Sequence, residues 1–356
     1  MIHPLFEGPL DIVGDVHGEL DALRELLGLL GYGADGTHAD GRRLVFVGDL
    51  VDRGPDSPGV VALVRGLVET GRAQVVLGNH ELNLLRGQHK LGNDWFWATD
   101  AHRDRGFAPC ASVAPEQRAA MLAWFDGLPL ALQRADLRVV HAVWHAPSIA
   151  RAAAARGPVL QAFASWEREA MQQLDAEGWS QRAAAQKAGY RHHFADQDYA
   201  MPMLDAVGHL DEARQLLNPL RVLTSGVERC AQAPFFASGQ WRFAHRVPWW
   251  QEYRDTTPVV MGHFWRQWQP LERAALGRHD ADLFEGTPPL DWLGDAERVF
   301  CVDYSAGGRY KERAQGGVGR TRLAALRWPE RTLVLDRGER VATHGFGGAA
   351  GSAEPT

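Results

Sequence analysis

Residues 43–54 read RLVFVGDLVDRG, and this stretch shows the pattern that the N-terminal part of the chain repeats. The apolar run Arg43–Val47 predicts a buried strand, and the Gly48-Asp49 pair after it predicts a tight turn. A helix is predicted next, near Gly59–Glu69. Two similar units flank this one: strand Leu10–Val13 with a helix near Glu19–Leu30, and strand Gln74–Leu77 with a helix near Glu81–Gln88.

Alternation of strands and helices predicts βαβ crossovers and a largely parallel sheet, in which ligands bind at the carboxyl ends of the strands. Residues 93–133 are predicted to be mostly helical, with a strand after them at Leu137–Val140. The Ala-, Gln- and Arg-rich residues 150–217 have helical periodicity and are interpreted as an inserted helical subdomain. Strands are expected again at Leu220–Leu223, Pro258–Met261, Arg298–Val302, Thr321–Leu326 and Thr332–Leu335, and a disordered tail is expected over residues 346–356.

Composition excludes several classes of protein. A net charge of −6 over 356 residues argues against a general electrostatic grip on nucleic acid or anionic lipid. We find no run of about 18 apolar residues, no signal peptide and no C-x-x-C pair, so a cytoplasmic protein without a membrane span is expected. The 13 Trp residues are interpreted as core or lid packing, with a base-stacking platform as the alternative.

Polar clusters follow five of the apolar runs. Each one alone is an ordinary strand-to-helix turn, in which Gly permits the turn and Asp or Asn caps the next helix. Together they can supply two Asp, one Asn and three His as ligands from the ends of different strands, which is the mixed O and N ligand set that two first-row divalent cations need. Arg53 adds a planar donor fork suited to phosphate oxygens. The clusters are Gly14-Asp15-Val16-His17-Gly18, Gly48-Asp49-Leu50-Val51-Asp52-Arg53-Gly54, Gly78-Asn79-His80-Glu81, His141-Ala142 and Gly262-His263.

The order G-D-x-H-G, G-D-x-x-D-R-G, G-N-H-E and two later histidines resembles the calcineurin-like metallophosphoesterase superfamily. The resemblance is to the branch that holds phosphoprotein Ser/Thr phosphatases, symmetrical diadenosine tetraphosphatases and bacterial polynucleotide kinase–phosphatases. It implies an α/β sandwich of two mixed sheets flanked by helices, in a metallophosphoesterase domain of residues 1–345 with the helical insertion at 150–217. The residues that match the family motifs directly number only about twenty, but the order and spacing of the motifs are specific.

Carried over by position, the resemblance implies that Asp15 and His17 hold one divalent metal and that Asp49 bridges two. Asn79, His141 and His263 would complete the second metal. His80 would be the general acid on the leaving oxygen, Asp52 would orient it, and Arg53 would grip the phosphate. Manganese is the expected metal, with iron or zinc as alternatives.

Some positions depart from the family pattern or leave a choice open. His141 is followed by Ala142 where the family has Gly, so His145 is a rival ligand. Trp265 stands where the phosphodiesterases of the superfamily have a metal-binding His, which favours the phosphatase branch. The segment around Asp303 resembles a closing motif of the tetraphosphatase and polynucleotide-phosphatase members, which implies that Asp303 lies beside the metals or His80; the alternative is a strand-end cap. Arg221 and Arg229 are the candidates for a second phosphate-binding arginine.

The expected activity is hydrolysis of phosphate monoesters by metal-activated water. Two alternatives stay open: a dinucleoside polyphosphate hydrolase, and a binding protein that retains an inactive site. The expected partner is a phosphorylated small molecule, nucleotide or phosphoprotein. Fold and metals alone do not choose among these substrates.

Overall fold

The computed structural model describes residues 1–100, 102–107, 109–237, 239–269, 282–316 and 319–347. Two mixed sheets form a sandwich, as predicted. The six-stranded sheet has the order β13-β12-β11-β2-β3-β4, in which β2, β3 and β4 are parallel and β11 joins β2 antiparallel. Its strands are β2 (Leu10–Val13), β3 (Arg43–Phe46), β4 (Ala73–Val75), β11 (Ala324–Trp328), β12 (Thr332–Leu335) and β13 (Arg340–Ala342).

The five-stranded sheet has the order β1-β5-β6-β9-β10, in which β6, β9 and β10 are parallel. Alternate side chains of the two sheets interdigitate between them: Ile12 and Val45 belong to the same buried cluster as Val139 and Val260. The strands are β1 (Ile2–Pro4), β5 (Ala131–Arg134), β6 (Leu137–Val140), β9 (Val259–Met261) and β10 (Val299–Cys301).

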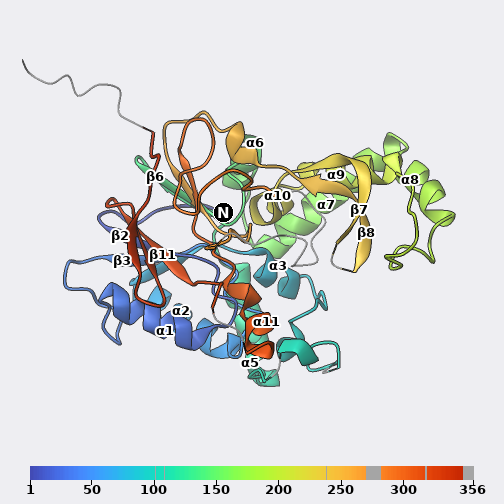
Figure 1. Ribbon diagram of the computed structural model, residues 1–356. Coiled ribbons are helices and arrows are strands. Elements are labelled where there is room, and N and C mark those ends of the chain that lie inside the picture. The colour runs from blue at the N-terminus through green and yellow to red at the C-terminus, as the bar shows by residue number, and fades with distance from the viewer. Residues whose placement is uncertain (101, 108, 238, 270–281, 317–318, 348–356) are drawn as a thin grey trace, which may run out of the picture.

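Helices α1 (Leu20–Leu30) and α2 (Ser57–Glu69) cover the outer face of the six-stranded sheet (Figure 1). Their apolar stripes bury residues such as Leu23 and Val60 against Phe46. The other short elements of this part are α3 (Asn79–Leu85), α4 (Asp94–Trp97), η1 (Arg105–Phe107), α5 (Pro115–Asp126), η2 (Trp249–Gln251), η4 (Ala306–Gly308) and α11 (Arg309–Ala314).

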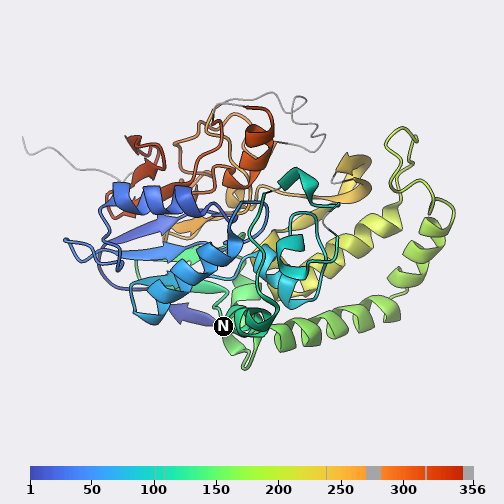
Figure 2. The ribbon, with the colours of Figure 1, turned by 90° about the horizontal axis from the view of Figure 1, so that it is seen from below.

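A helical arm lies beside the sandwich. In Figure 2, α7 and α9 run side by side away from the sheets, with α8 at the far end. The hairpin β7–β8 packs against α9, and Phe243 of β8 is buried with Val207 of α9. The elements are α6 (Ala146–Ala154), α7 (Val159–Ala176), α8 (Trp179–Ala188), α9 (Asp205–Leu217), α10 (Pro219–Ser225), β7 (Glu228–Ala237) and β8 (Gln240–Arg246).

The prediction of a strand at Leu220–Leu223 is wrong, because these residues lie in α10. Asn218 caps this helix by accepting the Leu220 N–H at 3.1 Å, and Pro219 occupies its first turn. A short apolar run fits a buried helix as well as a buried strand, so periodicity could not separate them. The helical prediction for residues 93–133 is also wrong at its end, where β5 begins at Ala131.

Five strands were not predicted as strands: β1, β5, the hairpin strands β7 and β8, and β13. The expected tail lies outside the described residues from residue 348 onward. Among the helices in the described ranges, none is both long and apolar enough to cross a bilayer.

Candidate metal centre

The predicted metal ligands and Asp303 lie at the carboxyl ends of six strands, three from each sheet. The three parallel strands of the six-stranded sheet and the three of the five-stranded sheet end at a shared rim, and the polar turns meet there. Asp15 and His17 follow β2, Asp49 follows β3, Asn79 follows β4, His141 follows β6, His263 follows β9 and Asp303 follows β10.

The Asp49 carboxylate lies at the middle of this cluster. Its Oδ2 is 3.8 Å from His17 Nε2 and 3.9 Å from His80 Nε2, and its Oδ1 is 3.4 Å from His141 Nε2. Two groups of potential metal ligands share it, namely His17-Asp49-His80 and Asp49-His141-His263, and all of these residues are buried. Asn79 adds an amide oxygen 3.1 Å from His141 Nε2.

The imidazoles are oriented so that a cation fits between them and Asp49. Nδ1 of His141 is 2.7 Å from the Val47 carbonyl, and Nδ1 of His17 is 3.0 Å from the Val51 carbonyl. A carbonyl only accepts, so each Nδ1 donates, and Nε2 is the nitrogen that each ring turns towards the carboxylate. Burial, followed by the charge of Arg53, holds the pKa of His17 well below its ordinary value, which keeps that ring neutral.

His263 gives independent support for a cation. Its Nε2 is buried and has no hydrogen-bond partner among the described residues, a state that is costly unless a ligand completes it. Burial opposes ionisation of Asp49, yet the neighbouring His141 and His80 hold the pKa of Asp49 well below its ordinary value. The donor set therefore fits divalent first-row metal ions.

The backbone of the rim is strained where it presents these groups. Six non-glycine residues of the rim have φ between +48° and +74°: His17, Asp49, Asp52, Arg53, His263 and Trp265. Two glycines permit close approach. A Cβ on Gly262 would lie 2.0 Å from Asp15 Oδ1, and one on Gly78 would lie 2.2 Å from Asp49 Oδ1.

Asp15 belongs to neither ligand group. Its carboxylate accepts the His263 N–H at 3.0 Å, and burial, followed by the charges of Asp303 and Asp49, raises its pKa well above the ordinary value. Asp303 accepts the Ser305 N–H and the Trp265 N–H, each at 2.8 Å, so it caps the end of β10 and also anchors the turn after His263. Burial raises the pKa of Asp303 to about 6.

His80 and Asp52 form a buried pair beside the ligand groups. Asp52 Oδ2 lies 2.5 Å from His80 Nδ1, and Asp52 Oδ1 accepts the indole N–H of Trp95 at 2.7 Å. With Nδ1 committed to Asp52, Nε2 is the nitrogen of His80 that faces Asp49. The same position makes His80 a member of one ligand group, so proton donor and metal ligand are both geometrically open to it.

Arg53 is held over the site by an aromatic ring. Its guanidinium carbon is 4.6 Å from the centroid of Trp265, and its Nη1 is 3.3 Å from His17 Nε2. Such stacking orients a guanidinium while leaving its edge donors available. Trp265 stands where the phosphodiesterases of the superfamily have a metal-binding His. In this chain its ring instead packs against Arg53, the predicted phosphate-binding arginine.

The other predicted arginines are paired with acids of the arm. Arg221 Nε lies 2.9 Å from Glu167 Oε2, and Arg229 Nη1 lies 3.4 Å from Glu212 Oε1. The rival histidine His145 lies outside both ligand groups, with Nδ1 2.8 Å from Ser148 Oγ.

Sequence reasoning missed Arg246 and Glu81. Arg246 ends β8 on the surface, and its charge, after burial, is the largest influence that lowers the pKa of His263. Glu81 is fully buried and accepts the backbone N–H groups of Gly78, Asp49 and Leu50 at 2.8–3.0 Å. It ties the turns after β3 and β4 together, and the G-N-H-E motif could have pointed to it.

Residues 8–163 match the family model described as calcineurin-like phosphoesterase. This part of the chain is a calcineurin-like phosphoesterase domain. The match contains Asp15, His17, Asp49, Asn79 and His141, whereas His263 lies beyond it.

Two curated relatives resemble this phosphoesterase domain. The asymmetrical bis(5'-nucleosyl)-tetraphosphatase PrpE of Oceanobacillus iheyensis is 51% identical over 80 residues, which are 22% of this chain and 32% of that protein. The symmetrical bis(5'-nucleosyl)-tetraphosphatase of Ralstonia nicotianae is 37% identical over 137 residues, 38% of this chain and 41% of that protein. The chain therefore spans about a third to two fifths of the length of these relatives.

A crystal structure of a cold-active protein-tyrosine phosphatase from a Shewanella species aligns with 96% of this chain and 82% of its own. The identity is 17% and the TM-score 0.43.

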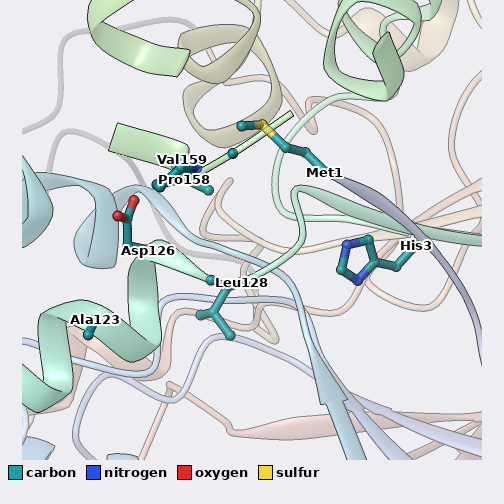
Figure 3. Close-up of a pocket in the computed structure, with 9 residues that line it drawn as sticks. Met1, His3, Ala123, Asp126, Leu128, Pro158 and Val159 are labelled. Carbon is teal, nitrogen blue, oxygen red and sulfur yellow. The ribbon is translucent and has the colours of Figure 1, made fainter. Parts of the chain in front are cut away.

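A separate pocket of about 420 Å³ lies between β1, the end of α5 and the start of α7 (Figure 3). Met1, His3 and Leu128 line it, together with Asp126, whose Oδ1 accepts the Leu160 N–H at 2.7 Å. None of the predicted site residues is among the residues that line this pocket.

Proposed function

We propose that the protein is a metal-dependent phosphoric ester hydrolase that cleaves phosphate monoesters. The observation that carries the proposal is the buried Asp49 carboxylate shared by two ligand groups, with the unpartnered His263 Nε2 beside it. A matching phosphoesterase domain supports the same reading.

The residues proposed as metal ligands are Asp15, His17, Asp49, Asn79, His141 and His263. Two divalent cations held there would lower the pKa of water and neutralise charge on the phosphate. Manganese is our preferred metal, because the set contains oxygen and nitrogen ligands but no thiolate. Iron and zinc remain alternatives.

The chain's own groups would then position the substrate and move a proton. Arg53, stacked on Trp265, would bind phosphate oxygens through its planar fork. Arg246, the charged neighbour of His263, replaces Arg221 and Arg229 as our second candidate for the phosphate. His80 would give the proton of Nε2 to the leaving oxygen, with Asp52 holding Nδ1.

We further propose that residues 1–345 form one phosphoesterase domain with the helical insertion at 150–217. The second candidate function is hydrolysis of dinucleoside polyphosphates, the substrates in the names of both curated relatives.

The deciding experiment measures metal content and p-nitrophenyl phosphate turnover together. We expect turnover to require divalent metal and to be greatest with manganese. Asp49→Asn should lower both metal occupancies and reduce turnover by about 10³-fold or more, because one carboxylate serves both ligand groups. Glu25→Asn, on the exposed face of α1, is the control. Full turnover after chelation, with no metal left by elemental analysis, would refute the proposal; metal binding without turnover of any phosphoester would indicate an inactive binding protein.

A further inference from the structure

Basic side chains from three separate elements gather between the metal centre and the helical arm. We call this set the basic strip: Arg86 and Lys90 after α3, Arg221 on α10, and Arg242 and Arg246 on β8. Figure 1 shows α3, α10 and the β7–β8 hairpin on the same side of the molecule.

The strip is held together by packing. The guanidinium carbons of Arg86 and Arg221 lie 4.2 Å and 5.3 Å from the centroid of one ring, Phe163 on α7. Arg242 and Arg246 are four residues apart on a strand, so they project from the same face of the hairpin. Both are exposed, and Arg246 Nε donates to the Ser225 carbonyl at the end of α10 at 3.1 Å.

Like charges are close to one another along the strip. Burial, then the charges of Arg86, Arg242 and Arg221, lowers the pKa of Lys90. Burial, then the charge of Arg221, lowers the pKa of Arg86 to about 10. A protein with a net charge of −6 thus concentrates cations at one place, where an anion would relieve their repulsion.

Acidic residues near the strip neutralise only part of this charge. Glu167 is shared between Arg221, at 2.9 Å, and Arg214, at 2.5 Å. Burial raises the pKa of Asp211 and of Glu228, and the charges of Arg242 and Arg221 act on both carboxyl groups. These three carboxylates face seven cations, namely the five of the strip, Arg214 and Lys187, so the positive charge is in excess.

The strip is continuous with the proposed catalytic site. Arg246 lies at one end: a Cβ placed on Gly226 would be 3.8 Å from Arg246 Cδ and 3.5 Å from the ring of Phe264, the residue after His263. Arg86 at the other end directly follows α3, the helix that begins with Asn79 and His80. Seven helical residues span about 10 Å, so Arg86 lies roughly that far from the start of α3.

We propose that the basic strip beyond Arg246, namely Arg86, Lys90, Arg221 and Arg242, binds the part of the substrate that is not cleaved, and that this part is a chain of phosphates. The proposal rests on the phosphoesterase function proposed above. Several guanidinium groups within a short span suit closely spaced phosphate charges. A long nucleic acid would instead meet the net negative charge of the remaining surface.

The test compares a strip variant with a charge-matched control. Lys90→Ala/Arg242→Ala removes two exposed cations of the strip. Arg24→Ala/Arg65→Ala removes two from α1 and α2, whose side chains are 63% and 41% exposed. Inhibition of p-nitrophenyl phosphate hydrolysis is measured with inorganic tripolyphosphate, orthophosphate and a single-stranded oligonucleotide, at constant ionic strength and buffered free manganese.

We expect the inhibition constant of tripolyphosphate to rise about tenfold or more in the strip variant and to stay within twofold in the control. Orthophosphate inhibition and kcat/KM for p-nitrophenyl phosphate should change little, because each carries a single phosphate. Equal tripolyphosphate inhibition of all three proteins would overturn the proposal. So would an oligonucleotide that inhibits more strongly than tripolyphosphate and loses that advantage in the strip variant, since this result assigns the strip to nucleic acid.

Direct calorimetric binding of tripolyphosphate in EDTA keeps the strip testable if the enzyme proves inactive. If tripolyphosphate binding weakens only in the strip variant, the result supports phosphate binding by the basic strip even if the protein proves not to be a hydrolase. If binding is absent, or equal in all three proteins, the proposal that the basic strip binds a chain of phosphates is wrong.

Discussion

The geometry allows His80 to be either a proton donor or a metal ligand. Its neighbour at the start of α3 helps to distinguish these two roles. Asn79 is proposed as a ligand, whereas His80 is held through Nδ1 by Asp52 and would donate a proton from Nε2. His80→Asn should therefore keep the metal content and lower turnover by about 10²–10⁴-fold. The loss should be smaller for leaving groups of low pKa, which need little protonation.

Turnover across a series of aryl phosphates, with metal analysis of each preparation, checks this. Asp52→Asn should show the same dependence on the leaving group in a milder form, because Asp52 only orients the imidazole. Loss of metal from His80→Asn, or equal losses for good and poor leaving groups, would make His80 a ligand or a packing residue instead.

Trp265 is a positioning residue for Arg53 in this structure. Removing the ring in Trp265→Leu should raise KM for p-nitrophenyl phosphate by about 3- to 10-fold, the scale of one cation–π contact. The hydrogen bond from the Trp265 N–H to Asp303 uses the backbone and is retained. Trp265→Phe should recover most of the loss, since a phenyl face still supports the guanidinium. If the Phe variant were as impaired as the Leu variant, the ring would not act through Arg53.

At the scale of elements, Glu167 joins three helices of the arm. It lies on α7, pairs with Arg221 of α10 and Arg214 of α9, and its Oε2 is 3.2 Å from Asn218 Nδ2. Burial would raise the pKa of Glu167, but the hydrogen bonds and charges of these arginines outweigh it and lower the pKa to about 2. The pairing therefore stabilises the fold above the ordinary pKa of 4.5 and loses this effect as the pH falls towards 2.

Glu167→Gln should lower the free energy of unfolding at neutral pH by at most about 1 kcal/mol, because the side chain is 17% exposed and solvent screens its ion pairs. The difference from the unmodified protein should shrink as the pH is lowered from about 5 to about 3. Urea unfolding at several pH values measures it, with Glu25→Gln on α1 as the control. A difference that did not change with pH would show that packing, and not the ion pairs, explains the loss.

At the scale of the whole molecule, the residues of the candidate metal centre come from both sheets. Asp49 follows β3 of the six-stranded sheet, whereas His141 and His263 follow strands of the five-stranded sheet. Ligands that bind only the folded state stabilise it by about 2.7 kcal/mol at a hundredfold excess over Kd. Manganese should accordingly raise Tm by about 3 to 4 °C for each occupied site over the protein in EDTA. Asp49→Asn should abolish most of that shift, and an unchanged shift would place the stabilising metal elsewhere.

The sandwich of two mixed sheets could be predicted because its determinants are local. Strand–turn–helix units repeat within the first 85 residues, and each polar motif follows an apolar run. Spacing and residue type predicted a cluster of Asp, Asn and His at the strand ends, because parallel strands bring their carboxyl ends to one edge. The strand expected at Leu220–Leu223 failed, because a four-residue apolar run carries no period and the capping by Asn218 decided for a helix.

By itself, the sequence determined which residue types stand at the turns after the strands, and hence the family resemblance and the expected metal chemistry. Only the tertiary structure decided their partners. It set Trp265 against Arg53, fixed the His80–Asp52 pair, drew Arg221 to Glu167 and brought Arg246 near His263. The physical reason is that the positions of strands and turns depend on short-range sequence patterns. The partner of a side chain depends instead on which distant segments the fold packs against it.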